Sequence, residues 1–455
     1  MGIHPLKTDT KATHTTKTFT KTDQVCVERT TCRICGSSPL KRVIDLGEQY
    51  IASRFVGEDV PKDLRRAYPL ELVRCAEKDK CGLVQLRHSI QPSLLYCDYG
   101  YRSGINESMR SNLAEIARKA EELVRLKKGD TVLDIGCNDG TLLASYQTRG
   151  IDRLGFDPAE NVARSAREIG FEVVIDFFSA QGYRKVRPNV KAKIITSIAM
   201  FYDLESPTHF VRDIASILHP EGVWVIELSY LPSMLRKNAF DTICHEHLEY
   251  YALSQIEWML EKEGLKVQRV ELNEVNGGSI RLFIGKKEST FAGPDNAREV
   301  ERMRRDEKSL GLDSDQPYSA FCDNVLKVRD DLRRLLLDLA RAGKTVYLYG
   351  ASTKGNVIIQ FFGIDKTWVL KAADRNPDKW GKRTLGTDIP IISEEQARTD
   401  KPDYFLVLPW HFFEGFKQRE RTFLEGGGKF IVPLPEVKVV GKECLSSSAR
   451  PAQPA

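Results

Sequence analysis

The sequence predicts an α/β protein in three parts: a small N-terminal unit held by cysteines, then two larger units in which buried strands alternate with helices. Two observations predict this arrangement. Four cysteines stand in two pairs before residue 82, and a strand–glycine turn–helix–strand pattern ending in Asp occurs twice, near residue 134 and near residue 350. With 455 residues, 41% hydrophobic and 29% charged, the chain is long enough for about three globular domains.

Charge and cysteine usage limit the partners and the location. The 68 Lys and Arg barely exceed the 63 Asp and Glu, which argues against nucleic acid as a partner. No apolar run is long enough to cross a bilayer, and no hydrophobic signal region is found at the N-terminus. The ten cysteines agree with a reducing compartment. We therefore expect a cytoplasmic protein without a membrane partner, either a monomer or a weak homo-oligomer.

The N-terminal unit, residues 25–95, follows a tail (1–24) that we expect to be disordered because it is rich in Thr and Lys. Two thiolate pairs brought together would make a tetrahedral zinc site, and zinc can stabilise a domain with a small core. Four cysteines leave no open position for water, so the zinc would be structural. Unligated core cysteines are the alternative, and Cys26 could replace one ligand. The expected ligands are Cys32, Cys35, Cys75 and Cys81.

The central unit, residues 96–290, is organised around the stretch from Thr131 to Ala144, TVLDIGCNDGTLLA. An apolar strand turns through glycines into a helix whose free amide groups face a polar ligand. A second strand ends in Asp157, 21 positions after Gly136, which suits a carboxylate that accepts ribose hydroxyls. Small residues needed only for packing are the alternative. The expected cofactor contacts are Asp134, Gly136, Asn138, Asp139, Gly140 and Asp157.

The details of this unit favour S-adenosylmethionine (SAM) over other nucleotides. The loop lacks the third-glycine spacing typical of NAD sites and the Gly-Lys-Ser/Thr of ATPases. Two alternating strands joined around Asn276-Gly277-Gly278 predict an antiparallel hairpin, which distinguishes the class I SAM methyltransferase fold from the dinucleotide-binding Rossmann fold. Phe177, near the end of the third strand, could contact the adenine or simply belong to the core.

The C-terminal unit, residues 318–440, follows a charged stretch (291–317) that we expect to be a linker, and precedes a disordered tail (441–455). It opens with a long helix and repeats the strand–glycine loop–helix–strand–acid order of a Rossmann-like fold. Ser352 and Lys354 at the start of a helix suit a diphosphate. A structural repeat without a ligand is the alternative.

The stretch most suited to chemistry is His245-Glu246-His247. Three adjacent ionisable groups cannot all point the same way on a regular element, so they are unlike a simple packed face. A histidine of ordinary pKa, ~6.5, can remove a proton at neutral pH. His-x-His also suggests a metal, although no third ligand is nearby, and an unrelated surface cluster is the other alternative.

From Cys32 to Val437 the chain resembles the sugar C-methyltransferases of deoxysugar biosynthesis, which act on nucleotide-linked 4-keto sugars. The resemblance rests on motifs in a shared order. These are the four cysteines with Cys81-Gly-Leu-Val-Gln, LDIGCNDG, His245-Glu246-His247 with Tyr250-Tyr251, Asn276-Gly-Gly-Ser-Ile-Arg281, Tyr349-Gly-Ala-Ser-Thr-Lys-Gly-Asn356 and Asp374-Arg-Asn-Pro-Asp-Lys379.

The resemblance implies that a base removes the proton next to the substrate ketone and that the enolate carbon attacks the SAM methyl group. By its place in the motif His247 is the expected base, with Glu246 and His245 beside it, and Tyr99 or Tyr101 facing the sugar. The sugar nucleotide would lie between the last two domains. The expected substrate contacts are Asn276, Gly277, Gly278, Arg281, Ser352, Lys354 and Asn356.

Two positions depart from the family pattern. Cys244 stands where a tyrosine often precedes His-Glu-His, and Met200 or Phe201 stands where a histidine often follows the fourth strand. We therefore expect a sugar pocket that differs from those of better-known members. Two other functions fit the same motifs: O- or N-methylation of a sugar or small molecule, and a non-catalytic zinc protein that binds SAM or a nucleotide.

Overall fold

The computed structural model describes residues 25–96, 100–289, 291 and 293–445. The N-terminal unit holds a four-stranded antiparallel sheet in the order β12-β5-β4-β2 and a two-stranded pair, β1 with β6. Its elements are β1 (Cys26–Glu28), β2 (Leu40–Gln49), β3 (Phe55–Val56), β4 (Tyr68–Cys75), β5 (Val84–Leu86), β6 (His88–Ile90) and α1 (Pro92–Tyr96).

The central unit is a seven-stranded sheet in the order β13-β14-β11-β10-β7-β8-β9. Its strands are β7 (Thr131–Ile135), β8 (Asp152–Phe156), β9 (Glu172–Val174), β10 (Ala192–Ile198), β11 (Leu218–Ser229), β13 (Leu265–Asn273) and β14 (Ser279–Lys286). The five from β11 to β9 are parallel, and the last two form the predicted antiparallel hairpin. This topology confirms the class I methyltransferase core expected from the sequence.

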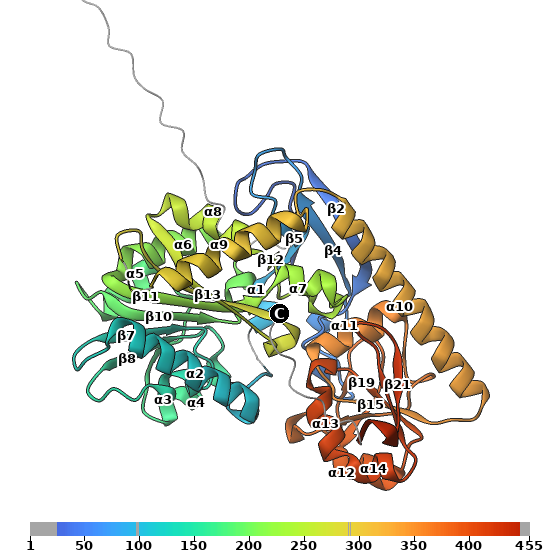
Figure 1. The fold of residues 1–455 in the computed structure, drawn as a ribbon. Coiled ribbons are helices and arrows are strands. Elements are labelled where there is room, and N and C mark those ends of the chain that lie inside the picture. The colour runs from blue at the N-terminus through green and yellow to red at the C-terminus, as the bar shows by residue number, and fades with distance from the viewer. Residues whose placement is uncertain (1–24, 97–99, 290, 292, 446–455) are drawn as a thin grey trace, which may run out of the picture.

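Helices cover both faces of this sheet (Figure 1). On one side lie α2 (Glu107–Val124), α3 (Thr141–Ser145) and α4 (Glu160–Glu168). On the other lie α5 (Ala180–Val186), α6 (Pro207–Ile217), α8 (Leu253–Lys262) and α9 (Pro294–Ser309). The linker expected at 291–317 is therefore wrong over α9, which contacts β13 and α8. Its few apolar side chains, Val300 and Met303, are both buried and suffice to dock the helix.

The C-terminal unit has a six-stranded sheet, order β18-β16-β15-β19-β20-β21, parallel except for its last strand. Its strands are β15 (Val346–Tyr349), β16 (Ala372–Asp374), β18 (Ile391–Ser393), β19 (Tyr404–Val407), β20 (Lys429–Val432) and β21 (Lys438–Val440). Its helices are α11 (Thr353–Phe362), α12 (Glu394–Asp400), α13 (Phe413–Arg419) and α14 (Arg421–Glu425). The long helix α10 (Gln316–Arg341) runs alongside this unit and reaches the N-terminal sheet (Figure 1).

The predicted disorder from residue 441 is wrong for residues 441–445. Residues Lys442–Leu445 form a short 3-10 helix, and Cys444 and Leu445 pack against the core of the C-terminal unit. Apolar burial explains why the chain stays ordered to this point. The expected tails 1–24 and 446–455 lie outside the described residues.

Two short strand pairs join the N-terminal unit to the others. β12 (Glu249–Tyr250), which follows the His-Glu-His stretch, pairs with β5 of the N-terminal sheet. β3 pairs with β17 (Arg383–Thr384) of the C-terminal unit. The N-terminal unit therefore holds segments from both larger units and fixes the space between them.

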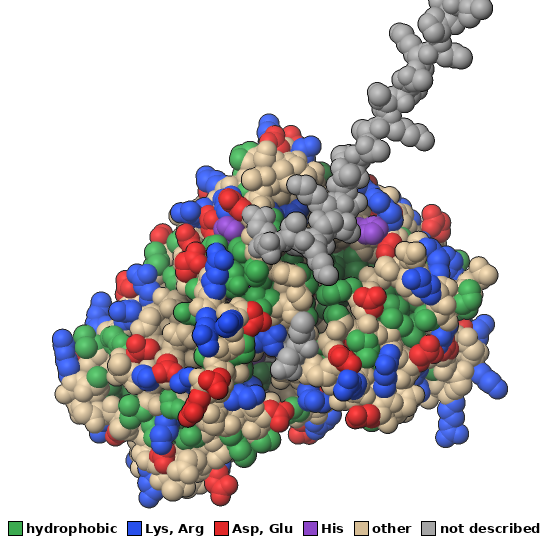
Figure 2. All heavy atoms as spheres, turned by 180° about the vertical axis from the view of Figure 1, so that it is seen from behind, with side chains coloured by type: hydrophobic (Ala, Val, Ile, Leu, Met, Phe, Trp, Pro, Cys, Tyr) green, Lys and Arg blue, Asp and Glu red, His purple; other side chains and the backbone are tan. Residues whose placement is uncertain are grey.

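On the face drawn in Figure 2, Lys and Arg side chains of the described residues are interspersed with Asp and Glu. Within the part of the chain that the structure describes, no helix combines the length and apolarity needed to span a membrane.

Candidate active site

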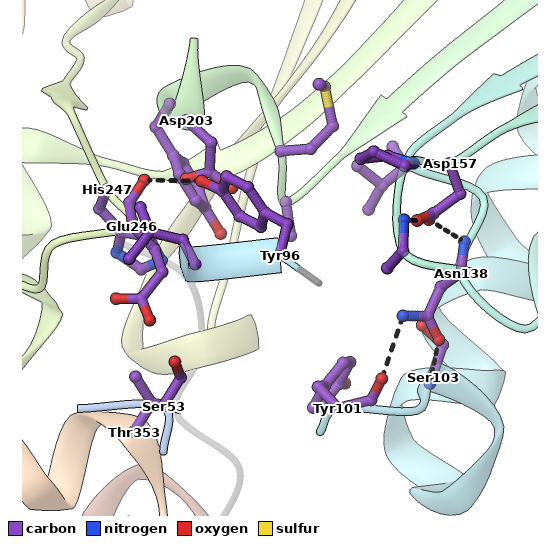
Figure 3. Close-up of a pocket in the computed structure, with 18 of the residues that line it drawn as sticks. Ser53, Tyr96, Tyr101, Ser103, Asn138, Asp157, Asp203, Glu246, His247 and Thr353 are labelled. Atoms are coloured by element: carbon purple, nitrogen blue, oxygen red, sulfur yellow. Dashed lines mark hydrogen bonds between the residues drawn. The ribbon is translucent and has the colours of Figure 1, made fainter. Parts of the chain in front are cut away.

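One cavity of about 850 Å³ lies where the three units meet, and side chains from all three line it. Figure 3 shows its walls. Asp157, Asn138, Ser103 and Tyr101 lie on one side, with Asp203, Glu246, His247 and Tyr96 opposite and Ser53 and Thr353 on a third side.

The wall formed by the ends of β7 and β8 has the features of a nucleoside site. Gly136 has φ +73°, and a Cβ there would meet the Met200 side chain at 3.1 Å, so glycine is required. Asp157 is buried, and its two carboxylate oxygens accept hydrogen bonds of 2.8 Å from the backbone amides of Asn138 and Ala159. The carboxylate thus shapes the glycine loop and lines the cavity at once.

Asp134 also lines the cavity and is fully buried. Its Oδ1 accepts a 2.6 Å hydrogen bond from the Thr196 hydroxyl. Burial raises the pKa of Asp134 to about 7, against the opposing effect of the Thr196 bond. This side chain acts within the loop as a hydrogen-bonded anchor at the end of β7.

Two of the predicted cofactor contacts lie behind the cavity lining. Asp139 accepts hydrogen bonds from the Gly104 amide at 2.8 Å and the Thr141 hydroxyl at 2.6 Å. Gly140 packs so closely that a Cβ would approach Ala166 at 3.0 Å. The Asp139 side chain and the lack of one at Gly140 therefore serve the tight turn into α3. The glycine spacing alone could not distinguish this structural role from contact with the cofactor.

Asn138 joins the loop to the segment before α2. Its Oδ1 accepts a hydrogen bond from the Ser103 amide at 3.0 Å, and its Nδ2 donates to the Tyr101 carbonyl at 3.1 Å (Figure 3). Tyr101 lines the cavity, and its residue is 45% exposed. Tyr99, the other tyrosine predicted to face a sugar, lies outside the described residues.

The two phenylalanines after β9 have different environments. Phe178 packs in the core, with its ring centre 5.5 Å from Phe156 and 5.3 Å from Phe210. Phe177 lines the cavity, is 55% exposed and meets the Tyr96 ring edge-on at 6.5 Å. Of the two alternatives, the core position belongs to Phe178, and Phe177 is the ring available to an adenine.

The opposite wall carries His247. Its Nδ1 lies 2.8 Å from the Thr242 carbonyl oxygen, which fixes the proton on Nδ1 and leaves Nε2 as the basic atom. The Tyr202 ring centre lies 4.3 Å away. Burial lowers the pKa of His247 to about 4, with the Glu246 carboxylate opposing this shift and Lys354 adding to it. The imidazole is therefore neutral at neutral pH and ready to accept a proton.

The neighbours of His247 play separate parts. His245 is buried, with Nε2 3.2 Å from the Tyr68 carbonyl, and it lies behind the lining, so the structure does not bring it to the predicted place in the site. Glu246 lines the cavity and is 5% exposed, and both of its carboxylate oxygens are buried without a hydrogen-bond partner. Cys244 and Met200 also line the cavity, whereas Phe201 belongs to the core.

The third wall comes from the C-terminal unit and the hairpin. Ser352 caps α11 by accepting a hydrogen bond from the Gly355 amide, and both Ser352 and Lys354 line the cavity. Lys354 donates a 2.7 Å hydrogen bond to the Asn276 carbonyl. Burial lowers the pKa of Lys354, against the opposing charge of Asp241. Lys379 lines the same wall, so two cations and a helix N-terminus face the cavity here.

Several predicted substrate contacts are structural instead. Arg281 is 1% exposed, lies on β14 and pairs with Glu227 at 2.7 Å, so its charge is satisfied inside the central unit. Asn356 is fully buried and donates to the Ala52 carbonyl at 2.6 Å, which attaches α11 to the N-terminal unit.

The hairpin glycines likewise serve the turn. Gly278 has φ +127°, and a Cβ there would lie 2.8 Å from Ser233. Gly277, at φ +95°, faces Trp410, and neither glycine lines the cavity. Asn276 is the hairpin residue that does.

The four predicted zinc ligands lie together away from the cavity. All four sulfur atoms fall within 4.8 Å of one another, at 3.4 Å for Cys32–Cys81, 3.5 Å for Cys35–Cys81 and 3.6 Å for Cys35–Cys75. Tetrahedral zinc with Zn–S bonds of ~2.3 Å needs separations of about 3.8 Å, so the cluster fits the ion. In the described part of the chain no other group of His, Cys, Asp or Glu side chains comes this close, and Cys26 takes no part.

Two site residues had no signal in the sequence analysis. Asp203 follows β10 and lines the cavity on the same side as Glu246 and His247 (Figure 3). Arg33 lies between the first two cysteines, and its buried side chain reaches Glu249 in β12 at 3.6 Å. An acid just past the carboxyl end of a parallel strand could have indicated Asp203, whereas nothing local could have indicated the partner of Arg33.

Comparisons with known proteins agree with this arrangement. Three family models match: a zinc binding domain over residues 32–96, a methyltransferase domain over 97–270 and a C-methyltransferase C-terminal domain over 274–435. The chain is 32% identical to C-methyltransferase NovU of Streptomyces niveus over 413 residues, covering 90% of this chain and 97% of that protein. It is 26% identical to the ubiquinone biosynthesis O-methyltransferase of Aeromonas salmonicida over 159 residues, 31% of this chain and 64% of that protein.

Among solved structures, the plantazolicin methyltransferase BpumL in complex with a substrate analogue and SAH is 14% identical. The match covers 40% of this chain and 86% of that one, with a TM-score of 0.33. Magnesium protoporphyrin IX methyltransferase from Synechocystis with bound SAM is also 14% identical, over 39% of this chain and 78% of that one, with a TM-score of 0.29.

Proposed function

The chain belongs to the family of SAM-dependent C-methyltransferases with a zinc-binding N-terminal domain, and from this premise we propose that it methylates a ring carbon next to the ketone of a nucleotide-linked 4-keto sugar. The observation that carries the proposal is that one cavity is shared by all three units. It joins the nucleoside wall at Asp157, the neutral imidazole of His247 and the cationic wall at Lys354.

The proton chemistry follows from the state of His247. A hydrogen next to a ketone is weakly acidic, and removing it leaves a nucleophilic carbon. Because Nδ1 is held by the Thr242 carbonyl, Nε2 is the atom that would take this proton. A carbon nucleophile needs no further base, and SAM supplies an electrophilic methyl group on a sulfonium.

The third wall, from the C-terminal unit, supports the proposed substrate class. Ser352, Lys354 and Lys379 surround the N-terminus of α11, which suits the two negative charges of a diphosphate. With the diphosphate held there, its sugar would extend towards His247. We further propose that the enzyme works in the cytoplasm, where sugar nucleotides and reduced thiols are found.

The test uses a panel of enzymatically prepared 4-keto sugar nucleotides incubated with SAM. We expect a new carbon-bound methyl group in the NMR spectrum of one product. In deuterated water without SAM, we expect deuterium to enter the carbon next to the ketone. A product methylated on oxygen or nitrogen would contradict the proposal.

His247→Asn should strongly slow both reactions, and His209→Asn is the matched control. His209 lines the same cavity, but its side chain is 63% exposed and pairs with Asp213 at 3.8 Å. Equal losses in both variants would mean that His247 is not the base.

A further inference from the structure

We propose that Asp203 is a second catalytic residue, a neutral carboxylic acid that donates a hydrogen bond to the substrate ketone oxygen while His247 removes the neighbouring proton. This inference rests on the proposed function. It assigns to the reaction a group that is needed in addition to a base, because the oxygen gains negative charge as the C–H bond breaks.

Asp203 has the required position. It ends the 3-10 helix Phe201–Asp203 directly after β10 and lines the cavity. The preceding residue, Tyr202, contacts the His247 ring, so the acid and the base come from adjoining parts of one wall. The Asp203 Oδ1 atom is buried and has no hydrogen-bond partner.

Glu246, a second buried carboxyl group on this wall, favours the protonated form of Asp203. Its residue is 5% exposed, and both of its oxygens are buried without a partner. Figure 3 shows Asp203 and Glu246 on the same side of the cavity. Burial and a neighbouring carboxylate both favour the neutral form of a carboxyl group, and Asp203 meets both conditions.

The surroundings assign that proton to Asp203. Two other acids of this region face cations: Glu205 binds Arg29 and the Ser89 hydroxyl, and Glu249 lies 3.6 Å from Arg33, although neither Glu249 oxygen has a hydrogen bond. Among the described residues no Lys or Arg forms an ion pair with Asp203 or Glu246. Burial and the nearby Glu246 charge raise the pKa of Asp203 well above its ordinary value.

The step balances. His247 Nε2 takes the proton, the C–H electrons form a C=C bond, and the C=O electrons move onto the oxygen that Asp203 hydrogen-bonds. As the ring carbon forms its bond to the methyl group, the methyl–sulfur bond breaks with its electrons left on sulfur, and the ketone reforms. Asp203 keeps its proton throughout, and His247 later releases its proton to solvent.

The activity test compares Asp203→Asn with Asp203→Leu by deuterium entry into the keto sugar. Asn still donates a hydrogen bond but cannot ionise, so we expect it to stay within about 10-fold of the parent. Leu removes the donor, and loss of one such donor lowers rates by about 10²–10³-fold. Equal loss in both variants would overturn the proposal, because it would show that the carboxylate charge is needed, as for binding a cationic amino group.

A second measurement needs no substrate. Infrared difference spectra between the parent and Asp203→Asn at neutral pH should show the carbonyl band of a neutral carboxyl group, and the absence of this band would overturn the proposal. The control is Asp176→Asn, which changes an exposed carboxyl in the same cavity and should leave that region of the spectrum unchanged. Failure of the proposed function would give a different result: the parent protein would neither exchange deuterium into any keto sugar nor methylate one.

Discussion

Replacing Arg33 with Met should destabilise the protein by breaking the link between the cysteine cluster and β12, the strand that follows His247. The guanidinium is fully buried, donates to the Leu86 carbonyl at 2.6 Å and the Ser89 hydroxyl at 2.7 Å, and lies 3.6 Å from Glu249. Both Glu249 oxygens lack any hydrogen bond, and burial raises the Glu249 pKa well above its ordinary value against the opposing charge of Arg33, so the variant leaves a buried carboxyl group without its cation. Removing one partner of a buried pair costs about 3–5 kcal/mol, which corresponds to a fall in melting temperature of about 6–20 °C.

The assay is equilibrium urea denaturation supported by thermal melts. Adding Glu249→Gln to Arg33→Met should recover part of the loss, because the second change removes the carboxyl group that has lost its cation. The control is Arg118→Met, whose exposed pair with Glu122 on α2 contributes at most about 0.5 kcal/mol. An Arg33→Met protein within about 1 kcal/mol of the parent would refute this account of the buried pair.

Four further changes test the site. His247→Asn should lower turnover by about 10²–10⁴-fold while SAM affinity by equilibrium dialysis stays near that of the parent; lost SAM binding would place the residue elsewhere. Because the pKa of His247 is lowered to about 4, the base is neutral at pH 6–7, and turnover should fall only as the pH approaches about 4; a limb centred near ~6.5 would contradict that shift. Cys75→Ser should reduce zinc per chain and lower the melting temperature, whereas full zinc content would argue against a four-cysteine site. Lys354→Ala should raise KM for the sugar nucleotide by about 10- to 100-fold without changing SAM affinity, and an unchanged KM would remove Lys354 from the diphosphate site.

The features predictable from the sequence are those set by neighbouring residues. The turn at Gly136 needs φ +73°, and the acid of β8 must follow at the spacing of one helix and one strand. Both conditions leave a local pattern, so the central fold and the cofactor could be predicted, and so could the place of Asp157 in the cavity wall. The four cysteines were predictable for a similar reason, since metal ligands occur in close pairs.

The failures concern side chains whose partners are distant in sequence. Arg281 follows the hairpin glycines in a motif, yet its partner Glu227 lies 54 positions earlier and turns it into an internal ion pair. The Asn356 side chain donates its hydrogen bond to the Ala52 carbonyl, 304 positions away in sequence. The helix α9 was missed because it is charged on most faces and docks through few apolar side chains, a pattern shared with linkers.

Contacts between residues distant in sequence also hold the segment around His247 against the N-terminal unit. His247 lies in an irregular stretch that ends in β12, a strand of only two residues, which cannot be stable alone. Its pairing with β5 and the approach of Arg33 to Glu249 come from the chain around the cysteine cluster. A zinc ion at the four cysteines would therefore support the proposed base without contacting the substrate, because it would hold the segment that carries Arg33, and Arg33 lies 3.6 Å from Glu249 in the strand after His247.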